Sequence, residues 1–212
     1  MACPIEPNNV PLASAGSFAV LGGSTVTSTG LTVLDGNLGV SPGTSITGFP
    51  PGIVNGTTYA GGPVAAQAQA DLVIAYGNAA ARPFATPVPA DIGGMTITPG
   101  TYVAPSTLGI SGTVTLDGQN NSGSTFIFQI PSTLTTAVNS KVKVIHGANA
   151  CNIFWQVGTS ATLNTNSHFK GTLMAAVSVS LGVGARVVGR ILTEAGAVTL
   201  LTNSIKIPHH HA

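Results

Sequence analysis

A pair of residues, the first bearing a hydroxyl group and the second aliphatic, recurs through the second half of this chain at nearly constant spacing. The pairs are Thr96-Ile97, Thr115-Leu116, Thr133-Leu134, Thr162-Leu163, Ser180-Leu181 and Thr199-Leu200. Four of the five steps measure 18 or 19 residues, and the step of 29 contains extra sequence around residues 141–150 that predicts an enlarged coil. Gly171 and Gly189 keep the register, because each lies eight residues after the aliphatic member of a pair. A fixed period of this kind indicates a solenoid built from stacked coils.

The length of the repeat predicts the shape of one coil. Six residues of strand extend about 20 Å at ~3.3 Å per residue, and three such strands close a triangular turn. Stacked coils hydrogen-bond as parallel strands ~4.7–4.8 Å apart and bury a continuous aliphatic ladder. We therefore predict a fold dominated by β-structure, a parallel β-solenoid of triangular cross-section, forming one domain over residues 1–208. Residues 209–212 contain three histidines and are interpreted as the remnant of a tag.

The surface of this chain must be polar without being charged. Only 6% of the residues are charged, against about a quarter in ordinary soluble proteins. The mean hydropathy is +0.41, yet no apolar run of ~18 residues is present to span a bilayer. The net charge of +1 gives no electrostatic footprint for nucleic acid or an anionic membrane, so we expect neither as a partner. Thr and Ser supply the polar surface instead.

Strand alternation turns the repeat into a candidate binding face. The aliphatic member of each pair is expected to point inward and its hydroxyl neighbour outward, and residues two places away share the outward face. The predicted column is Thr96, Thr115, Thr133, Thr162, Ser180 and Thr199. The predicted neighbours are Thr98, Thr113, Thr135, Ser160, Asn164 and Ser178, with Thr25 and Thr27 from a weaker N-terminal echo that recurs at Ser45-Ile46. The simpler alternative is that Thr merely suits exposed strand positions.

A helix is predicted beside the solenoid. Residues 126–130, 153–157 and 171–175 are apolar on both strand faces, which is typical of strands covered on both sides. Residues 63–82 are rich in Ala, begin with a proline that suits the first helical turn, and end before Pro83. The expected apolar stripe of this helix is Val64, Ala68, Leu72, Ala75 and Ala79. We expect this stripe to pack against the doubly apolar strands.

An ordered set of short segments resembles the microbial ice-binding (antifreeze) protein family. They are Leu38-Gly39-Val40-Ser41-Pro42-Gly43, Ile46-Thr47-Gly48-Phe49, Ala65 to Leu72, Ala75-Tyr76, Pro99-Gly100-Thr101-Tyr102, Leu116-Asp117-Gly118, Phe154-Trp155-Gln156-Val157, Phe169-Lys170-Gly171 and Gly189-Arg190. The resemblance implies a right-handed, discontinuous β-solenoid with its helix along one side and a flat second side that adsorbs to ice. It further implies thermal hysteresis, inhibition of ice recrystallisation, secretion to the extracellular space or the periplasm, and a monomer.

Some members of this family carry a Thr-Ala/Gly-x-Thr/Asn motif near the ice-binding side. Two stretches of this chain match the motif, and they name Thr29, Thr32, Thr136 and Asn139 as further candidate residues. The stretches that begin at Thr165 and Val183 depart from it, so the motif does not form a regular array.

Other functions find little support in the residues. Catalysis by a solenoid enzyme requires paired carboxylates or a carboxylate with a base, whereas the acidic residues here are scattered, and only His146 and His168 lie outside the tag. We expect no catalytic residue, metal ion or cofactor, because no Cys/His cluster or Asp-rich repeat is present. An adhesion or structural module without ice activity remains the alternative. Cys3 and Cys151 fit either one disulfide of an extracellular protein or free thiols.

Overall fold

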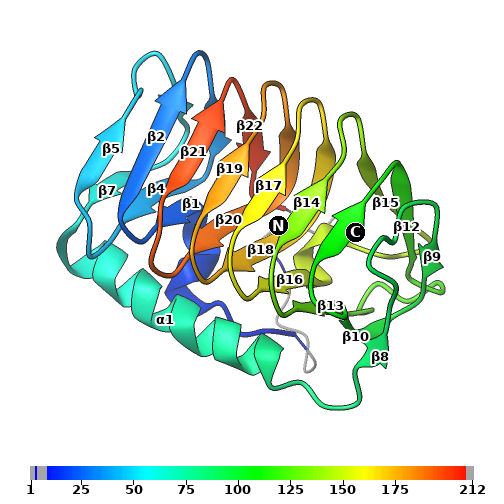
Figure 1. The fold of residues 1–212 in the computed structure, drawn as a ribbon. Helices are drawn as coiled ribbons and strands as arrows, with labels where there is room; N and C mark the ends of the chain where they lie inside the picture. Colours follow the sequence, from blue (N-terminus) through cyan, green and yellow to red (C-terminus); the bar gives the residue numbers. More distant parts are fainter. Residues whose placement is uncertain (1–2, 4–8, 209–212) are drawn as a thin grey trace.

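The computed structural model describes Cys3 and residues 9–208, so the predicted tag at 209–212 lies outside the described residues. Within that part the chain forms a solenoid whose coils have three sides, and every strand pairing is parallel. Figure 1 shows the coils stacked side by side, with a single long helix running along them. The predicted three-sided, parallel solenoid is confirmed.

The first side, called here the hydroxyl side, is a seven-stranded sheet. In spatial order its strands are β5 (Ser45–Thr47), β2 (Thr25–Thr29), β21 (Val198–Leu201), β19 (Val179–Leu181), β17 (Ala161–Leu163), β14 (Leu134–Thr136) and β11 (Leu108–Ile110). Its strands alternate between buried and outward residues, as the repeat predicts.

The second side, called the basic side, carries most of the Lys and Arg residues. Its strands are β6 (Ile53–Val54), β3 (Val33–Asp35), β22 (Ser204–Lys206), the first halves of β20 (Arg186–Thr193) and β18 (His168–Ala175), β15 (Lys141–Ile145), β12 (Thr113–Asp117) and β9 (Thr96–Ile97).

The third side faces the helix. Its strands are β7 (Thr58–Ala60), β4 (Asn37–Val40), β1 (Phe18–Gly22), the second halves of β20 and β18, β16 (Ile153–Val157), β13 (Phe126–Ile130), β10 (Gly100–Val103) and β8 (Thr86–Pro87). Strand β16 is buried at every position and β13 at all but one, because side chains of the solenoid core cover one face and the helix covers the other.

The order of coils in space differs from their order in the sequence. The N-terminal strands β1, β2 and β3 pair with the C-terminal strands β20, β21 and β22. Helix α1 (Gly62–Ala80) follows β7 and carries the chain along the solenoid to β8 at the other end, from which the chain winds back (Figure 1). The discontinuous winding implied by the family resemblance is therefore present.

The buried stripe of α1 differs from the predicted one at its first position. Ala68, Leu72, Ala75 and Ala79 are fully buried, as expected, but Val64 is 45% exposed. Ala65, which is fully buried three residues before Ala68, takes its place. The helix packs on side chains of the helix-facing strands that point away from the solenoid interior: Phe18, Leu21, Ile127, Phe154, Met174 and Leu192.

Side chains near the ends of the helix bind it to the sheet through hydrogen bonds. Gln129 donates from Nε2 to the carbonyl oxygens of Ala79 (3.0 Å), Ala80 and Arg82, at and just beyond the helix C-terminus. Gln69 donates from Nε2 to the carbonyl oxygens of Gly22 and Thr193, both at 3.0 Å. These bonds fix the position of the helix along the solenoid.

The interior of the solenoid contains a row of aromatic rings from neighbouring coils. Tyr102, Phe128, Trp155 and Phe169 lie in sequence, and the rings of Phe128 and Trp155 are stacked with centroids 4.0 Å apart. The Trp155 indole Nε1 donates to the carbonyl oxygen of Lys170 at 3.0 Å, so the one polar atom of this ring has a partner. The enlarged coil predicted around residues 141–150 is also present, since β15 is followed by a turn and the 3-10 helix η2 (Ala150–Asn152).

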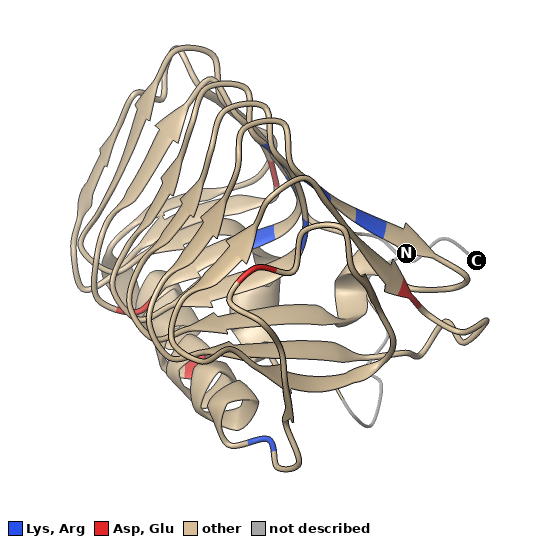
Figure 2. Ribbon diagram, turned by 45° about the vertical axis from the view of Figure 1, so that its right-hand side comes forward, with Lys and Arg blue, Asp and Glu red and all other residues tan. Residues whose placement is uncertain are grey.

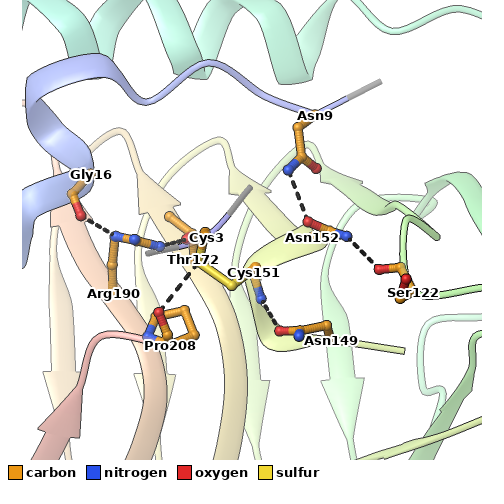
Figure 3. Close-up of a disulfide and its surroundings, with 10 residues drawn as sticks. All are labelled: Cys3, Asn9, Gly16, Ser122, Asn149, Cys151, Asn152, Thr172, Arg190 and Pro208. Carbon is orange, nitrogen blue, oxygen red and sulfur yellow. Dashed lines mark hydrogen bonds between the residues drawn. A yellow bond between two sulfur atoms is a disulfide. The ribbon is translucent and has the colours of Figure 1, made fainter. Parts of the chain in front are cut away.

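The N-terminal segment is attached to the solenoid by a disulfide between Cys3 and Cys151 (Figure 3). Asn9 donates from Nδ2 to Oδ1 of Asn152 at 2.9 Å, and the buried Arg190 donates from Nε to the carbonyl oxygen of Gly16 at 2.8 Å. Gly16 belongs to the 3-10 helix η1 (Ala13–Ser17). The disulfide decides between the two cysteine states that the sequence left open.

No helix among the described residues combines the length and the apolar character that crossing a membrane requires.

Candidate functional site

Two parallel columns of outward residues run across the hydroxyl side. The first contains Thr47, Thr27, Thr199, Ser180, Thr162, Thr135 and Gly109, which face one another on successive strands. The second contains residues two places earlier in the chain: Ser45, Thr25, Ala197, Ser178, Ser160, Thr133 and Thr107. Ser45 and Thr25 begin their strands, and the other five directly precede theirs. The residues between the columns point inward; Val26, Leu134 and Val198 are fully buried. Twelve of the fourteen column positions carry a Thr or Ser hydroxyl.

The columns form a regular and uncharged array. Successive strands of a sheet lie ~4.7–4.9 Å apart, and positions two residues apart on one strand are separated by ~6.6 Å. None of the seven strands contains Lys, Arg, Asp or Glu, and the hydroxyl side is drawn in tan throughout in Figure 2. The branched Cβ of Thr restricts χ1, so these side chains need little ordering to present a fixed surface. Ser160 and Ser178 are also hydrogen-bonded to each other across neighbouring strands, with 3.0 Å between their Oγ atoms.

Four predicted residues are on a different side of the solenoid. Thr96 faces Thr115 on the basic side, in strands β9 and β12, and Thr113 lies on β12 two residues earlier. Thr98 directly follows β9, so it is not part of the hydroxyl side either. Thr133 is on the hydroxyl side but in the second column, because Thr135 is the residue that faces Thr162. The predicted single column therefore combined two sides of the coil.

The error has a physical cause. Strands on the basic and the hydroxyl sides both alternate between outward and buried residues, so hydroxyl–aliphatic pairs occur on both. The coils around β12–β15 are longer than 18 residues, since residues 118–125 connect β12 to β13 and a turn with η2 connects β15 to β16. The 18 residues from Thr115 to Thr133 therefore advance the chain from one side to another. From Thr162 onward the coils are short, and Thr162, Ser180 and Thr199 align as predicted.

The residues of the predicted motif occupy the corner that follows the hydroxyl side. Thr32 is fully buried and accepts hydrogen bonds from Ser28 Oγ (2.8 Å) and the Asn203 amide, and Thr136, 1% exposed, accepts one from the Asn164 amide at 3.0 Å. The prediction that Thr32 and Thr136 face a ligand is wrong, because both hydroxyl groups satisfy backbone and side-chain donors inside the corner. Asn164 also donates from Nδ2 to the carbonyl oxygen of Thr136 at 2.8 Å, which binds one coil to the next.

A row of left-handed residues turns the chain at this corner. In order along the solenoid these residues are Gly48, Gly30, Thr202, Gly184, Asn166, Asn139 and Gly112, with φ between 53° and 92°. Gly30 is the second residue of one motif match, whereas Asn139 is the fourth residue of the other. The two matches are therefore out of register, and Thr29 and Asn139 do not occupy equivalent places. Asn and Gly serve here because they tolerate positive φ better than other residues do.

Sequence reasoning missed three members of the columns. Ser45 and Thr47 extend the two columns onto β5, and Thr107 extends the second column to β11. The triplet Ser45-Ile46-Thr47 repeats Thr25-Val26-Thr27 after twenty residues, and Thr107-Leu108 is itself a hydroxyl–aliphatic pair. These signals were present in the sequence, but only the pairing of the N-terminal coils with the C-terminal ones gives them a place in the array.

None of the seven strands carries a titratable group, but Asp91 pairs with Gly109 and so borders the first column at its β11 end. Asp91, at the β11 end of the sheet, has its pKa lowered by hydrogen bonds from the Ser111 hydroxyl and from backbone amides. Burial lowers the pKa of Arg190 to about 10, and this guanidinium lies beneath the N-terminal segment. Asp117, whose pKa is lowered by the Gln119 amide and His146, ends strand β12 on the basic side. The described residues contain no group of three His, Cys, Asp or Glu placed to hold a metal ion.

Comparison with known proteins identifies relatives along nearly the whole chain. The model of the family described as ice-binding-like matches residues 20–206. An ice-binding protein of Nostoc sp. (strain HG1) is 47% identical over 196 residues, which are 92% of this chain and 72% of the relative. An ice-binding protein of Flavobacterium frigoris is 34% identical over 217 residues, covering 94% of this chain and 76% of the relative.

Solved structures agree in fold as well as in sequence. The crystal structure of an ice-binding protein from an Antarctic biological consortium aligns with a TM-score of 0.94 and 45% identity, covering 99% of this chain and 97% of that one. An ice-binding protein of the Antarctic ascomycete Antarctomyces psychrotrophicus aligns with a TM-score of 0.93 and 36% identity, covering 96% of this chain and all of that one. The residues, the fold and these relatives together show that the chain belongs to the ice-binding-like protein family.

Proposed function

We propose that this protein adsorbs to ice through the two hydroxyl-bearing columns of the hydroxyl side. The observation that carries the proposal is a seven-stranded parallel sheet whose outward positions are almost all Thr or Ser and include no charge. The printed names of the relatives, which are ice-binding proteins, support the same function. The proposed contact residues are Thr25, Thr27, Ser45, Thr47, Thr107, Thr133, Thr135, Ser160, Thr162, Ser178, Ser180 and Thr199, with Asn164 at the margin.

The geometry suggests how the adsorption works. Water around a small apolar group keeps its hydrogen bonds and forms an ordered shell, and a row of Thr methyl groups at ~4.8 Å spacing orders such water along a lattice-like line. The neighbouring hydroxyl groups hold this water by hydrogen bonds at modest entropic cost. Many weak contacts at fixed positions then act together, and a charged group, which orients water around itself, would disturb the array.

Adsorption of this kind changes how ice grows. Ice between bound molecules must bulge outward, and the curved surface has a lower freezing point than a flat one. We therefore infer that the protein separates the freezing point from the melting point, an effect called thermal hysteresis, and slows the recrystallisation of ice. Neither effect requires bond chemistry, so the proposed function includes no catalytic step, metal ion or cofactor.

The setting in which the protein acts is part of the proposal. The Cys3–Cys151 disulfide supports an oxidising compartment, since such bonds are rare in the cytosol. We propose that the protein is secreted, outside the cell or into the periplasm, and works as a monomer whose binding unit is the whole solenoid with its helix, corresponding to the predicted domain 1–208. Size-exclusion chromatography with light scattering tests the monomer.

The test of ice adsorption is thermal hysteresis on a single ice crystal, with the crystal shape recorded. The proposal expects a gap between melting and freezing points and a faceted crystal. The contradicting result is no gap and an unshaped disc of ice from a protein that circular dichroism shows to be folded. That result would favour an adhesion or structural module.

A further inference from the structure

The cations of this protein are concentrated on one side of the solenoid. Of the seven Lys and Arg residues, five project from the basic side: Lys141, Lys143, Lys170, Arg186 and Lys206. The other two do not, since Arg190 is buried and Arg82 follows the C-terminus of α1, where it donates to Asn78 and to the Asn9 carbonyl oxygen. Figure 2 shows the blue cationic segments on these strands, whereas the hydroxyl side has none. A net charge of +1 therefore conceals a strongly uneven distribution.

The five cations form two rows across neighbouring strands. Lys141 faces His168, and His168 faces Arg186, on three adjacent strands. Lys143 and Lys170 lie two residues further along the first two of these strands, and Lys206 lies further along the same side, facing Val188. Like charges on neighbouring strands repel and destabilise a sheet, which applies to Lys143 and Lys170, whereas His168 separates Lys141 from Arg186 and Val188 separates Lys170 from Lys206.

None of these five cations forms an ion pair with a carboxylate among the described residues. The one ion pair in this part of the chain joins His146 to Asp117. The basic side has two acidic residues, Asp117 on β12 and Asp35 on β3, and Asp35 directly faces Lys206 on the neighbouring strand β22. Asp35 accepts a hydrogen bond from Asn55 Nδ2 at 2.6 Å, and Asp117 accepts from His146 and the Gln119 amide. Lys206 therefore has one carboxylate across from it, whereas the other four cations face no acidic residue on the neighbouring strands. Four of the five cations are exposed, and Lys170 is partly exposed.

Two hollows lie beside the rows of cations, the first lined mostly by polar residues and the second mostly by apolar ones. A hollow of about 860 Å³ follows the first row, and the amides of Asn139 and Asn166 line it together with Thr202 and Ser204. A second hollow, of about 520 Å³, lies beside Lys170 and Lys206. Amide and hydroxyl groups are hydrogen-bond partners for sugar hydroxyls, and cations at successive strands suit a ligand with repeated negative charge.

From this placement we propose that the basic side binds a linear, carboxylate-bearing polysaccharide. The described outward residues of this side include no Phe, Tyr or Trp, which disfavours single-stranded nucleic acid because it binds largely by base stacking on aromatic rings. The same lack of aromatic anchors, and the hollows, disfavour insertion into a lipid surface. The basic and hydroxyl sides meet at the corner formed by Gly30 and Asn139, so a polysaccharide held here leaves the hydroxyl columns free.

The experiment measures binding of the whole protein to alginate, a linear polyuronate, at low salt and again at about 0.5 M salt. Neutral dextran is the uncharged control. The proposal expects binding to alginate that weakens steeply with salt, because binding releases condensed counterions, and none to dextran. Arg186→Gln should weaken binding severalfold, and Lys141→Gln combined with Lys170→Gln should weaken it further. Arg82→Gln is the matched control, since it removes the same charge from elsewhere and should leave binding unchanged.

Three results would overturn the proposal. The first is that Arg186→Gln and Arg82→Gln bind alginate equally well. The second is that the folded protein does not bind alginate at low salt. The third is that it binds phosphatidylglycerol vesicles or single-stranded DNA more tightly than alginate. The proposal goes beyond ice adsorption and is independent of it, because alginate binding is measured directly and not through an effect on ice. Thermal hysteresis of Arg186→Gln should equal that of the unchanged protein, so failure of one proposal leaves the other measurable.

Discussion

Threonine has three different roles in this molecule, and its position in the coil decides which one it has. Thr162 lies at the centre of a strand and projects from the hydroxyl side, whereas Thr115 occupies a similar strand position on the basic side. Thr136 directly follows an outward residue and is therefore buried. Its hydroxyl oxygen accepts a hydrogen bond from the backbone amide of Asn164. A count of Thr residues does not distinguish these roles, but strand pairing does.

The buried role leads to a prediction about Thr136. Replacing Thr136 with Val keeps the shape of the side chain but removes the acceptor of the Asn164 amide, and an unsatisfied buried donor costs about 1–3 kcal/mol. We expect the free energy of unfolding in urea to fall by that amount, while thermal hysteresis near 0 °C stays unchanged. A loss of hysteresis in the folded variant would mean that the motif contacts ice after all.

At the scale of elements, the helix is held by one buried face and exposes the other. Leu72 is fully buried against the helix-facing strands, whereas Ile74, two residues later, is 64% exposed. Leu72→Ala leaves a cavity between helix and sheet and should lower the free energy of unfolding by about 2–5 kcal/mol. Ile74→Ala, the matched control on the same helix, should change it by less than about 0.5 kcal/mol. Equal effects of the two substitutions would contradict the observed packing of α1.

The contact between the helix and η1 adds a pH-dependent part to the stability. Asp71 accepts hydrogen bonds from the hydroxyl and amide of Ser14, and these bonds lower its pKa in the folded protein. The unfolded chain, with an ordinary pKa near 4, binds protons more readily. The contribution is therefore present above pH ~4 and is lost as pH falls through the lower folded pKa.

Asp71→Asn should accordingly be less stable than the unchanged protein at neutral pH. We expect the difference between their melting temperatures, measured by circular dichroism, to be largest at pH 7 and to shrink as the pH falls below the ordinary aspartate value. A difference that stays constant with pH would mean that the charge of Asp71 does not contribute.

At the scale of the whole molecule, the disulfide joins two residues that are far apart in the chain. Cys3 and Cys151 are 148 residues apart, and the bond lies at the junction of the basic and helix-facing sides, opposite the hydroxyl columns. Replacing both cysteines with serine should lower the free energy of unfolding by about 2–5 kcal/mol, the usual cost of losing a native disulfide. Thermal hysteresis near 0 °C should be unchanged; a large loss without unfolding would indicate that the bond shapes the binding surface.

The sequence predicted those features that depend on local periodicity. The three-sided coil, the helix and the inward position of residues such as Leu163 all follow from spacings within one coil. The prediction that Thr115 lies beside Thr133 failed because it depends on how the coils stack: the long connection at residues 118–125 shifts the register between sides. The bonds from Gln129 to the helix end and the place of Thr47 beside Thr27 join residues distant in sequence, which local patterns do not reveal.

The central claim is that ice contacts the hydroxyl side rather than any Thr-bearing surface. The most direct test compares thermal hysteresis on single ice crystals for Thr162→Tyr and Thr115→Tyr, two strand-centre substitutions of equal size on different sides. We predict that Thr162→Tyr loses most of the hysteresis, because the larger ring interrupts the flat array, and that Thr115→Tyr keeps it. If both folded variants retain the activity, or if Thr115→Tyr alone loses it, the ice-binding surface lies elsewhere.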